Sequence, residues 1–344
     1  FKPFWLKQAA APPPPTLCNP ACERGSMLAP QSATFQAERF GTLYDAQFDS
    51  GGRLLASAHA DGVVRIWSAE KHEVLAELKG HRAPVLSLSW GQGRFAGTLA
   101  SGSSDGQVVV WRLAKTGDWM IAHQTYITGS VSDLGFCPPD YGLVLAVAGT
   151  DDLGVVTMMV GKESDVDSGR PKNEPWQVRS FAAHEGGVTA LSWAPSASPA
   201  TLATGPAVSR AAPHATRRLV TCGADGAMRI WHGDARMEIW EQKHELSDQQ
   251  HTGDTRDVAW RPNMGVPSSV LASCTQDGTV ATWTQDMEGQ PWRLRCCWKV
   301  QGDARRLAWS KAGSLLSVSV NENESLLYKE GQDGQWEKVC SYEE

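Results

Sequence analysis

Short runs of alternating apolar and polar residues recur along most of the chain, and six of them end in an aromatic residue. Residues 85–90 read Val-Leu-Ser-Leu-Ser-Trp, and residues 188–193 read Val-Thr-Ala-Leu-Ser-Trp. Alternation with a period of two, bounded by turn-forming residues, predicts a β-strand. The aromatic residues that close these runs are Phe48, Trp90, Phe136, Trp193, Trp260 and Trp309.

A second apolar run follows each predicted strand and leads into a turn. In four copies the turn is Asp-Gly, and a Trp follows the Asp by six residues, as in Asp105 and Trp111. Because Gly tolerates the positive φ of tight turns, Asp-Gly between two apolar runs predicts a β-hairpin. The corresponding turn positions in all six copies are Asp61, Asp105, Asp151, Asp225, Asp277 and Asn321.

The spacing of these turns defines a repeat. The intervals are 44, 46, 74, 52 and 44 residues, and three of them lie at or next to the roughly 40–45 residues of a four-stranded repeat. A later column of Trp residues predicts the fourth strand: Trp119, Trp176, Trp240, Trp292 and Trp336. Six repeats of four strands predict an all-β fold, a six-bladed β-propeller in which each blade is one sheet.

Length and composition favour a repeat over one large core. The chain has 344 residues, more than the roughly 250–300 at which single cores stop growing. Its 15 Trp outnumber its 5 Tyr and 8 Phe, as expected when one structural position is filled repeatedly. Residues 1–38 are rich in Pro and Ala and are predicted to be a flexible tail. The propeller is predicted over 39–344, with a disordered insertion at about 194–216.

Charge and motifs argue against nucleic-acid binding and catalysis. The 32 basic and 38 acidic residues give a net charge of −6, which argues against broad electrostatic binding to nucleic acid or anionic lipid. The sequence shows no Gly-x-Ser-x-Gly elbow, phosphate-cradling loop or paired metal ligands. We therefore predict no enzymatic activity, catalytic residue, cofactor, metal or small-molecule substrate.

Ser or Thr, His and Asp nevertheless recur together with Trp in three repeats. A catalytic triad occurs once and faces a cleft, whereas these sets recur at positions expected to be buried. Burying His or Asp is costly unless their hydrogen bonds are satisfied. The pattern therefore predicts three structural tetrads that tie the entry loop of a blade to its hairpin: His81, Ser101, Asp105 and Trp111; His184, Thr221, Asp225 and Trp231; and His251, Ser273, Asp277 and Trp283.

Several longer strings resemble the Sec-thirteen family of WD-repeat propellers, over about residues 40 to 340. That family is the small WD-repeat subunit of the outer COPII coat and is also found in the Y-shaped nuclear-pore scaffold. The strings include Leu78-Lys79-Gly80-His81 and Ser192-Trp193-Ala194-Pro195. Two others are far more specific than general repeat signals: Arg256-Asp257-Val258-Ala259-Trp260 and Thr275-Gln276-Asp277-Gly278.

The resemblance implies an open WD-repeat β-propeller that a partner completes by inserting a blade between blades one and six. The implied partner is the large COPII outer-coat subunit or a helical nucleoporin, with membranes contacted only indirectly and no direct nucleic-acid binding. The implied location is the cytoplasmic face of the ER membrane, the COPII vesicle coat and the nuclear pore complex, in ER-to-Golgi protein transport.

The resemblance also implies a contact surface on blades one and six. Residues of a strand alternate between faces, and the sequence alone does not say which alternate set looks into the gap. The implied contact residues are Leu43, Tyr44, Phe48, Leu54, Ile66 and Trp67 in blade one, and Leu307, Trp309, Leu315, Leu316, Leu327 and Tyr328 in blade six.

Blade six departs from the family pattern, and other classes of protein compete with this interpretation. Asn321-Glu322-Asn323-Glu324 stands where the family has a glycine-rich Asp turn, and Tyr328 stands where it has Trp.

One alternative is the related Seh-one-type propeller of the pore and a nutrient-signalling complex. Another is a closed WD-repeat adaptor that binds peptides, which an aromatic or Arg-lined channel would indicate. An enzyme is the weakest alternative.

Overall fold

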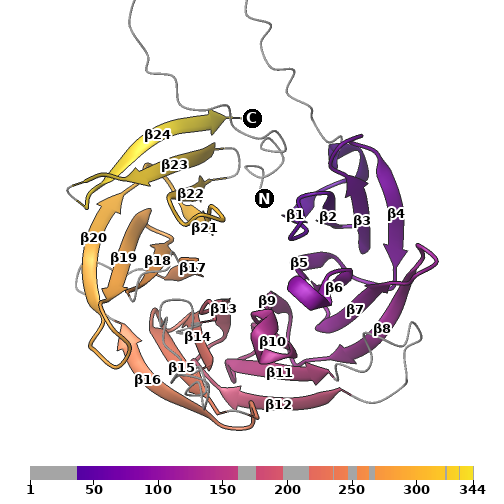
Figure 1. Cartoon of the computed structure of the whole chain (residues 1–344), viewed down its shortest axis with the longest axis horizontal. Helices are drawn as coiled ribbons and strands as arrows, with labels where there is room; N and C mark the ends of the chain where they lie inside the picture. Colours follow the sequence, from indigo (N-terminus) through magenta and orange to yellow (C-terminus); the bar gives the residue numbers. More distant parts are fainter. Residues whose placement is uncertain are drawn as a thin grey trace, which may run out of the picture.

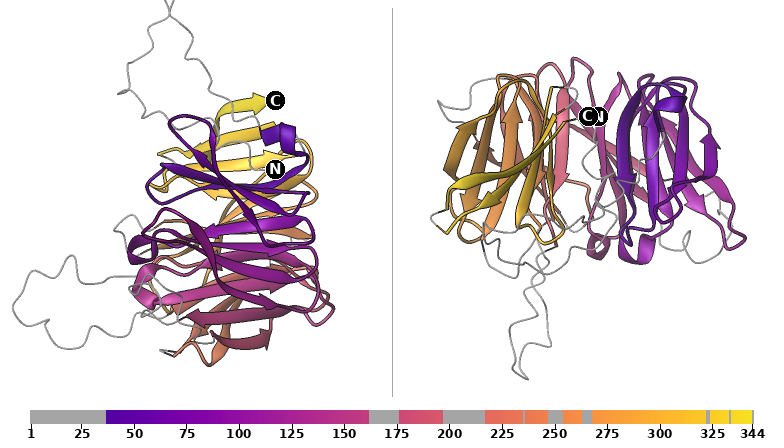
Figure 2. Two further views of the ribbon diagram at one scale, coloured as in Figure 1. Left: turned by 90° about the vertical axis from the view of Figure 1, so that its right-hand side faces the viewer. Right: turned by 90° about the horizontal axis from the view of Figure 1, so that it is seen from above.

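The computed structural model describes residues 37–161, 176–196, 217–234, 236–246, 254–262, 268–321, 324–332 and 334–343. They form six four-stranded antiparallel sheets arranged around a central channel (Figure 1). Seen edge-on, the sheets span the thickness of the ring (Figure 2). The prediction of an all-β, six-bladed propeller is confirmed.

Within each blade the strands follow chain order from the channel to the rim. Blades one to three consist of β1 (Leu43–Phe48), β2 (Leu54–His59), β3 (Val63–Ser68) and β4 (Val74–Lys79); β5 (Val85–Trp90), β6 (Thr98–Ser103), β7 (Gln107–Leu113) and β8 (Trp119–Tyr126); and β9 (Val131–Phe136), β10 (Leu143–Gly149), β11 (Val155–Gly161) and β12 (Gln177–Ala182). Blades four to six consist of β13 (Val188–Trp193), β14 (Arg217–Gly223), β15 (Met228–Gly233) and β16 (Trp240–Leu246); β17 (Thr255–Trp260), β18 (Ser269–Thr275), β19 (Thr279–Gln285) and β20 (Arg293–Lys299); and β21 (Ala304–Trp309), β22 (Leu315–Val320), β23 (Glu324–Glu330) and β24 (Trp336–Glu343).

Within these ranges three short 3-10 helices accompany the sheets: η2 (Ala37–Phe40), η3 (Gly93–Phe95) and η4 (Pro139–Tyr141). Apart from its last two residues, the predicted tail at 1–38 lies outside the described residues, as do residues 197–216 of the predicted insertion. Within the described ranges no helix is long and apolar enough to cross a membrane.

Turn chemistry explains the hairpins that the Asp-Gly pairs predict. Gly106 has a φ of +81°, and a Cβ there would lie 2.5 Å from the carbonyl oxygens of Ile127 and Gly129. Glycine is therefore required both for the backbone conformation and for the close approach of the neighbouring loop. Asp105 fixes the same turn by accepting a hydrogen bond from the Gln107 backbone N–H at 3.2 Å.

The apolar core is divided into clusters that lie between blades. Five clusters each combine buried residues from two consecutive blades, from blades one and two through to blades five and six. In the sixth cluster, the buried members among the described residues all belong to blade one: Leu43, Ala46, Leu55 and Trp67. Figure 1 shows the corresponding interruption of the ring between β1–β4 and β21–β24, which we call the join.

Candidate interaction site at the join between blades one and six

The innermost strands connect consecutive blades through a repeated set of hydrogen bonds. The Leu88 backbone N–H donates to Asp45 Oδ2 at 2.9 Å, and the Trp90 indole N–H donates to the Gln47 carbonyl oxygen at 2.8 Å. Blade four is tied to blade three, and blade six to blade five, by the same two types of bond. The acceptors of the backbone N–H groups there are Asp133 and Asp257.

The connections from blades two and four to the next blade use a hydroxyl instead. Ser89 Oγ accepts a hydrogen bond from the Phe136 backbone N–H at 3.0 Å, and Ser192 Oγ accepts one from the Trp260 backbone N–H at 2.9 Å. Each of the five pairs of consecutive blades therefore includes a hydrogen bond in which a side chain of the earlier blade accepts a backbone N–H of the later one. Blade six has Arg306 and Ala308 at the two equivalent positions, so its innermost strand offers neither acceptor to a following blade.

Blade one carries a separate apolar cluster on its face opposite blade two, toward the join. Leu55 and Trp67 are buried in the blade-one cluster, and Phe40, Phe48 and Val74 pack around it. Among the described residues, this cluster has no member from blade six. A hydrogen bond at the edge of the ring spans the join, from Lys311 Nζ to the Ser50 carbonyl oxygen at 2.8 Å.

The outer part of the same blade-one surface is charged. Arg65, 4% exposed, forms ion pairs with Asp61 at 2.6 Å and with Glu77 at 3.2 Å. Its guanidinium carbon lies 3.9 Å from the centre of the Phe40 ring. The Phe40 ring thereby covers one face of the guanidinium, and the two carboxylates pair with its edges. Both contacts limit the free-energy cost of burying the charge of Arg65.

Apart from Tyr44, which lines a pocket at the channel, the implied contact residues fall into three groups. Leu43, Phe48 and Trp67 belong to or pack on the blade-one cluster at the join. Leu315 and Leu327 alternate with residues that face blade five, so they lie on the opposite face of their strands. Six others pack into cores with blade two or blade five and so differ from the expectation: Leu54, Ile66, Leu307, Trp309, Leu316 and Tyr328.

One predicted tetrad has all four residues connected. His184 Nδ1 and Asp225 Oδ1 are 2.8 Å apart, and His184 Nε2 and Thr221 Oγ1 are also 2.8 Å apart. The Trp231 indole N–H donates to Thr221 Oγ1 at 2.9 Å. Burial lowers the pKa of His184. Although burial raises the pKa of Asp225, hydrogen bonds from Arg229 and His184 lower it further.

The other two tetrads differ from the expected arrangement or are described only in part. His81 Nε2 and the Trp111 indole N–H both contact Ser101 Oγ, at 2.6 and 2.7 Å. Asp105 accepts instead from the Ser103 hydroxyl at 2.5 Å, and His81 Nδ1 is buried without a hydrogen-bond partner. His251 lies outside the described residues; Asp277 accepts from Thr275, and the Trp283 indole N–H donates to Ser273 Oγ at 2.9 Å.

Blade one contains a related set that the sequence analysis missed. His59 Nε2 lies 2.8 Å from Ser57 Oγ, which also accepts the Trp67 indole N–H at 2.7 Å. The histidine comes from β2 rather than from the loop that enters the blade. Burial, assisted by Arg65, lowers the pKa of His59 to about 4. The signal in the sequence is a His two residues after the strand Ser of the same repeat.

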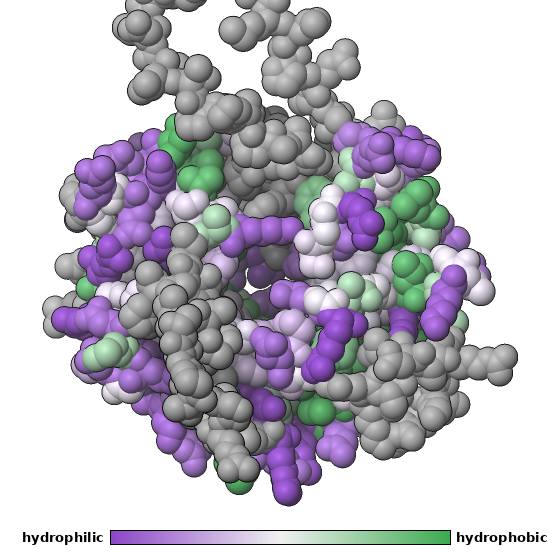
Figure 3. Space-filling view, in the orientation of Figure 1, coloured by the Kyte–Doolittle hydropathy of each residue, from purple (hydrophilic) through white to green (hydrophobic). Residues whose placement is uncertain are grey.

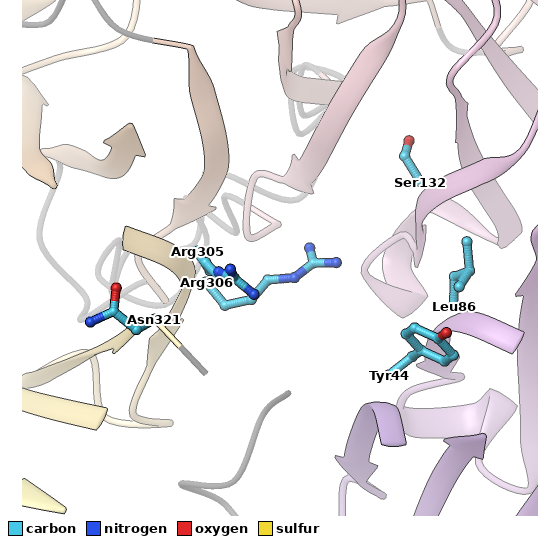
Figure 4. Close-up of a pocket in the computed structure, with 6 residues that line it drawn as sticks. All are labelled: Tyr44, Leu86, Ser132, Arg305, Arg306 and Asn321. Carbon is cyan, nitrogen blue, oxygen red and sulfur yellow. The ribbon is translucent and has the colours of Figure 1, made fainter. Parts of the chain in front are cut away.

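A pocket of about 260 Å³ lies at the channel beside the join. Its lining residues are Tyr44, Leu86, Ser132, Arg305, Arg306 and Asn321. Figure 4 shows the two arginines and Asn321 on one side and the other three residues on the opposite side. Hydrophilic residues gather around the central opening on the face seen in Figure 3. In the described ranges, no group of three His, Cys, Asp or Glu residues is arranged to hold a metal ion.

Comparison with known proteins defines the class of this propeller. The family model described as "WD domain, G-beta repeat" matches residues 30–68, 72–112 and 175–232. A solved structure described as "Crystal Structure of Mitotic Checkpoint Complex" matches with a TM-score of 0.59 at 19% identity, over 81% of this chain and 71% of that chain. The fold is that of a WD-repeat propeller.

Relatives define the family within that class. "Protein SEC13 homolog" of Drosophila melanogaster is 34% identical over 300 residues, which cover 86% of this chain and 80% of that protein. "Protein transport protein sec13" of Emericella nidulans is 32% identical over 314 residues, which cover 88% of this chain and 95% of that protein. The chain belongs to the SEC13 family, as its resemblance to the Sec-thirteen strings predicts.

Proposed function

We propose that this chain is a non-enzymatic scaffold subunit in protein transport and that a partner completes its ring by inserting a blade at the join. The observation that carries the proposal is the blade-one cluster, whose buried members Leu43, Ala46, Leu55 and Trp67 all come from one blade. The other five clusters are each shared by two blades. Several relatives carry the name "Protein transport protein", which supports a role in protein transport.

The resemblance to the Sec-thirteen strings supports a more specific assembly. We assign the chain to the outer COPII coat in ER-to-Golgi transport and to the nuclear-pore Y-complex. The large coat subunit or a helical nucleoporin would donate the blade. A blade that packs on both sides of the join buries on the order of 2,000 Å² or more, the size of an obligate interface.

The chemistry of the join supports a sheet as the occupant. Apolar side chains of β1, β2 and β3 form its blade-one wall, and the charged pair of Arg65 with Glu77 lies toward the rim. An amphipathic sheet with an apolar inner part satisfies both regions, because buried sheets pack apolar faces against one another. The Tyr44 side chain, 36% exposed, lies where such a sheet meets the channel.

The test compares two substitutions in the full chain by affinity purification and mass spectrometry. Phe48→Asp places a charge beside the blade-one cluster, whereas Leu75→Asp places the same charge on outer strand β4, where Leu75 is 54% exposed. We expect the native chain and Leu75→Asp to co-purify with coat or pore subunits and Phe48→Asp to lose them. Equal recovery by both variants contradicts the proposal.

A closed adaptor that binds peptides is the second candidate. Arg305 and Arg306 at the channel favour it, because cationic groups around a propeller channel suit acidic peptides. A closed ring, however, needs a core shared by blades one and six. The blade-one cluster has no blade-six member among the described residues, which favours the scaffold.

A further inference from the structure

Arg306 breaks a repeated pattern on the innermost strands. The position three residues before the closing aromatic is Asp45, Ser87, Asp133, Ala190, Asp257 and then Arg306 in blades one to six. The odd-numbered blades have Asp there, and each Asp accepts the backbone N–H of a Leu on the next blade. Blade six instead has a hydrogen-bond donor, Arg306, at this position beside the channel.

The guanidinium of Arg306 is available to an incoming group. The residue is half-buried on β21 and lines the pocket beside the join. Within the described part of the chain no hydrogen bond or ion pair engages it. A partly buried guanidinium with five N–H donors and no acceptor is costly, and a carboxylate matches its geometry best.

The carboxylates around the channel stabilise the positive charge of Arg306 but do not accept hydrogen bonds from it. Burial lowers the pKa of Arg306, but the negative charges of Asp257, Asp133 and Asp45 raise it by more. Asp257 accepts the backbone N–H groups of Val258 and Leu307, at 2.9 and 2.8 Å. Asp133 likewise accepts two backbone N–H groups and a Ser87 hydroxyl. The oxygens of these two carboxylates therefore already accept hydrogen bonds, including those that connect consecutive blades.

The position of the pocket identifies the source of the missing acceptor. It is lined by residues of β21 in blade six, β1 in blade one, and β5 and β9 beyond, so it includes residues of both blades that border the join (Figure 4). A blade inserted after blade six continues the alternation as a seventh, odd-numbered member. In this chain the odd-numbered members carry an aspartate at that level of the channel.

We propose that the innermost strand of the blade inserted at the join carries an acidic side chain whose carboxylate binds Arg306. This inference rests on the proposed function and names the chemistry by which the partner is recognised. The pocket takes one carboxylate, with the Tyr44 ring and Leu86 on the wall opposite the arginines.

The test uses small probes on the full chain and follows the arginine side-chain Nε–Hε signals by NMR. The probes are N-acetylaspartyl amide, its neutral isostere N-acetylasparaginyl amide, N-acetylglycine and inorganic phosphate. We expect the aspartyl probe to shift the Arg306 signal saturably and to bind at least tenfold more tightly than each of the other three. Arg306→Gln should abolish the shift, and Arg179→Gln, on outer strand β12 and paired with Glu238, should leave it intact.

Each other result overturns the proposal. If the asparaginyl probe binds as tightly as the aspartyl probe, the site does not require a carboxylate. If phosphate binds more tightly than the aspartyl probe, the ligand is a different anion. If N-acetylglycine binds more tightly, the ligand is the carboxylate of a chain terminus. No shift of the Arg306 signal in the native chain excludes the site even if Arg306→Gln does not fold. If Phe48→Asp loses the partners while the aspartyl probe fails to bind, the proposed function stands and this inference falls.

Discussion

Replacing Thr221 by Val tests whether the tetrads are structural. Thr221 is fully buried, and its hydroxyl contacts the Trp231 indole N–H at 2.9 Å and His184 Nε2 at 2.8 Å. Valine has nearly the same shape but leaves both groups without a partner. Each buried unsatisfied polar group costs about 1–3 kcal/mol, so we expect Thr221→Val to lower the free energy of unfolding by about 2–4 kcal/mol.

Thr282→Val is the matched control for this experiment. Thr282 is also fully buried in a strand next to a tetrad Trp, but its hydroxyl has no hydrogen-bond partner. Removing that hydroxyl should leave stability unchanged or raise it, because an unsatisfied polar group is lost. Urea unfolding followed by Trp fluorescence measures both variants. Equal stability of Thr221→Val and the native chain refutes the structural interpretation of the tetrad.

Three further predictions concern the turn glycines, the buried histidines and the connections between blades. Gly154→Ala should destabilise the chain by more than Gly52→Ala. Both glycines have a positive φ, which costs an alanine about 1–2 kcal/mol, but only at Gly154 would a Cβ meet a carbonyl oxygen, that of His184, at 1.7 Å. Equal urea midpoints for the two variants would contradict this prediction. Burial lowers the pKa of His59 from 6.5 to about 4. As the pH falls from 6.5 toward 4, the unfolded chain therefore binds a proton at this residue before the folded chain does. The free energy of unfolding should fall as a result, by roughly 1–2 kcal/mol at pH 5. An NMR titration that places the pKa of His59 near 6.5 would exclude that contribution. Asp133→Ala removes the acceptor of the Leu191 backbone N–H and the Ser87 hydroxyl and should cost about 2–4 kcal/mol, with faster hydrogen exchange at Leu191; unchanged exchange there counts against the connection.

The repeat could be predicted from the sequence because each blade reuses the same local signals. The six aromatic residues that close alternating runs end β1, β5, β9, β13, β17 and β21 in the structure. The glycine of an Asp-Gly turn has a positive φ and lies close to a neighbouring loop, as at Gly106, so no other residue fits there. These features depend on a few residues each, so periodicity and turn chemistry suffice to find them.

The surface at the join could not be assigned in the same way, because both faces of a blade are apolar. Leu315 and Leu316 are neighbours of the same type, yet Leu316 packs against blade five while Leu315 lies on the other face. An irregularity between Ala304 and Arg306 also shifts the register of β21 against β22. Alternation alone therefore gives two equivalent sets, and only packing against the neighbouring blade separates them.

The His81 set shows how a nearby group changes a predicted contact. Ser103 lies two residues before Asp105 and supplies a hydroxyl at 2.5 Å, while in blade four Gly223 occupies the position equivalent to Ser103. The Asp225 carboxylate there reaches His184 instead. The sequence contains this difference, but its consequence depends on which group lies closer after folding.

Hydrogen–deuterium exchange of β1 in the free chain and in the purified complex tests the central claim most directly. Strand β1 forms the innermost edge of blade one at the join, and β13 holds the equivalent place between two blades of the ring. We predict that the backbone amides of Leu43–Phe48 become strongly protected when the partner binds, while those of Val188–Trp193 keep the same protection. Unchanged exchange in β1, or protection confined to other parts of the ring, would contradict an inserted blade.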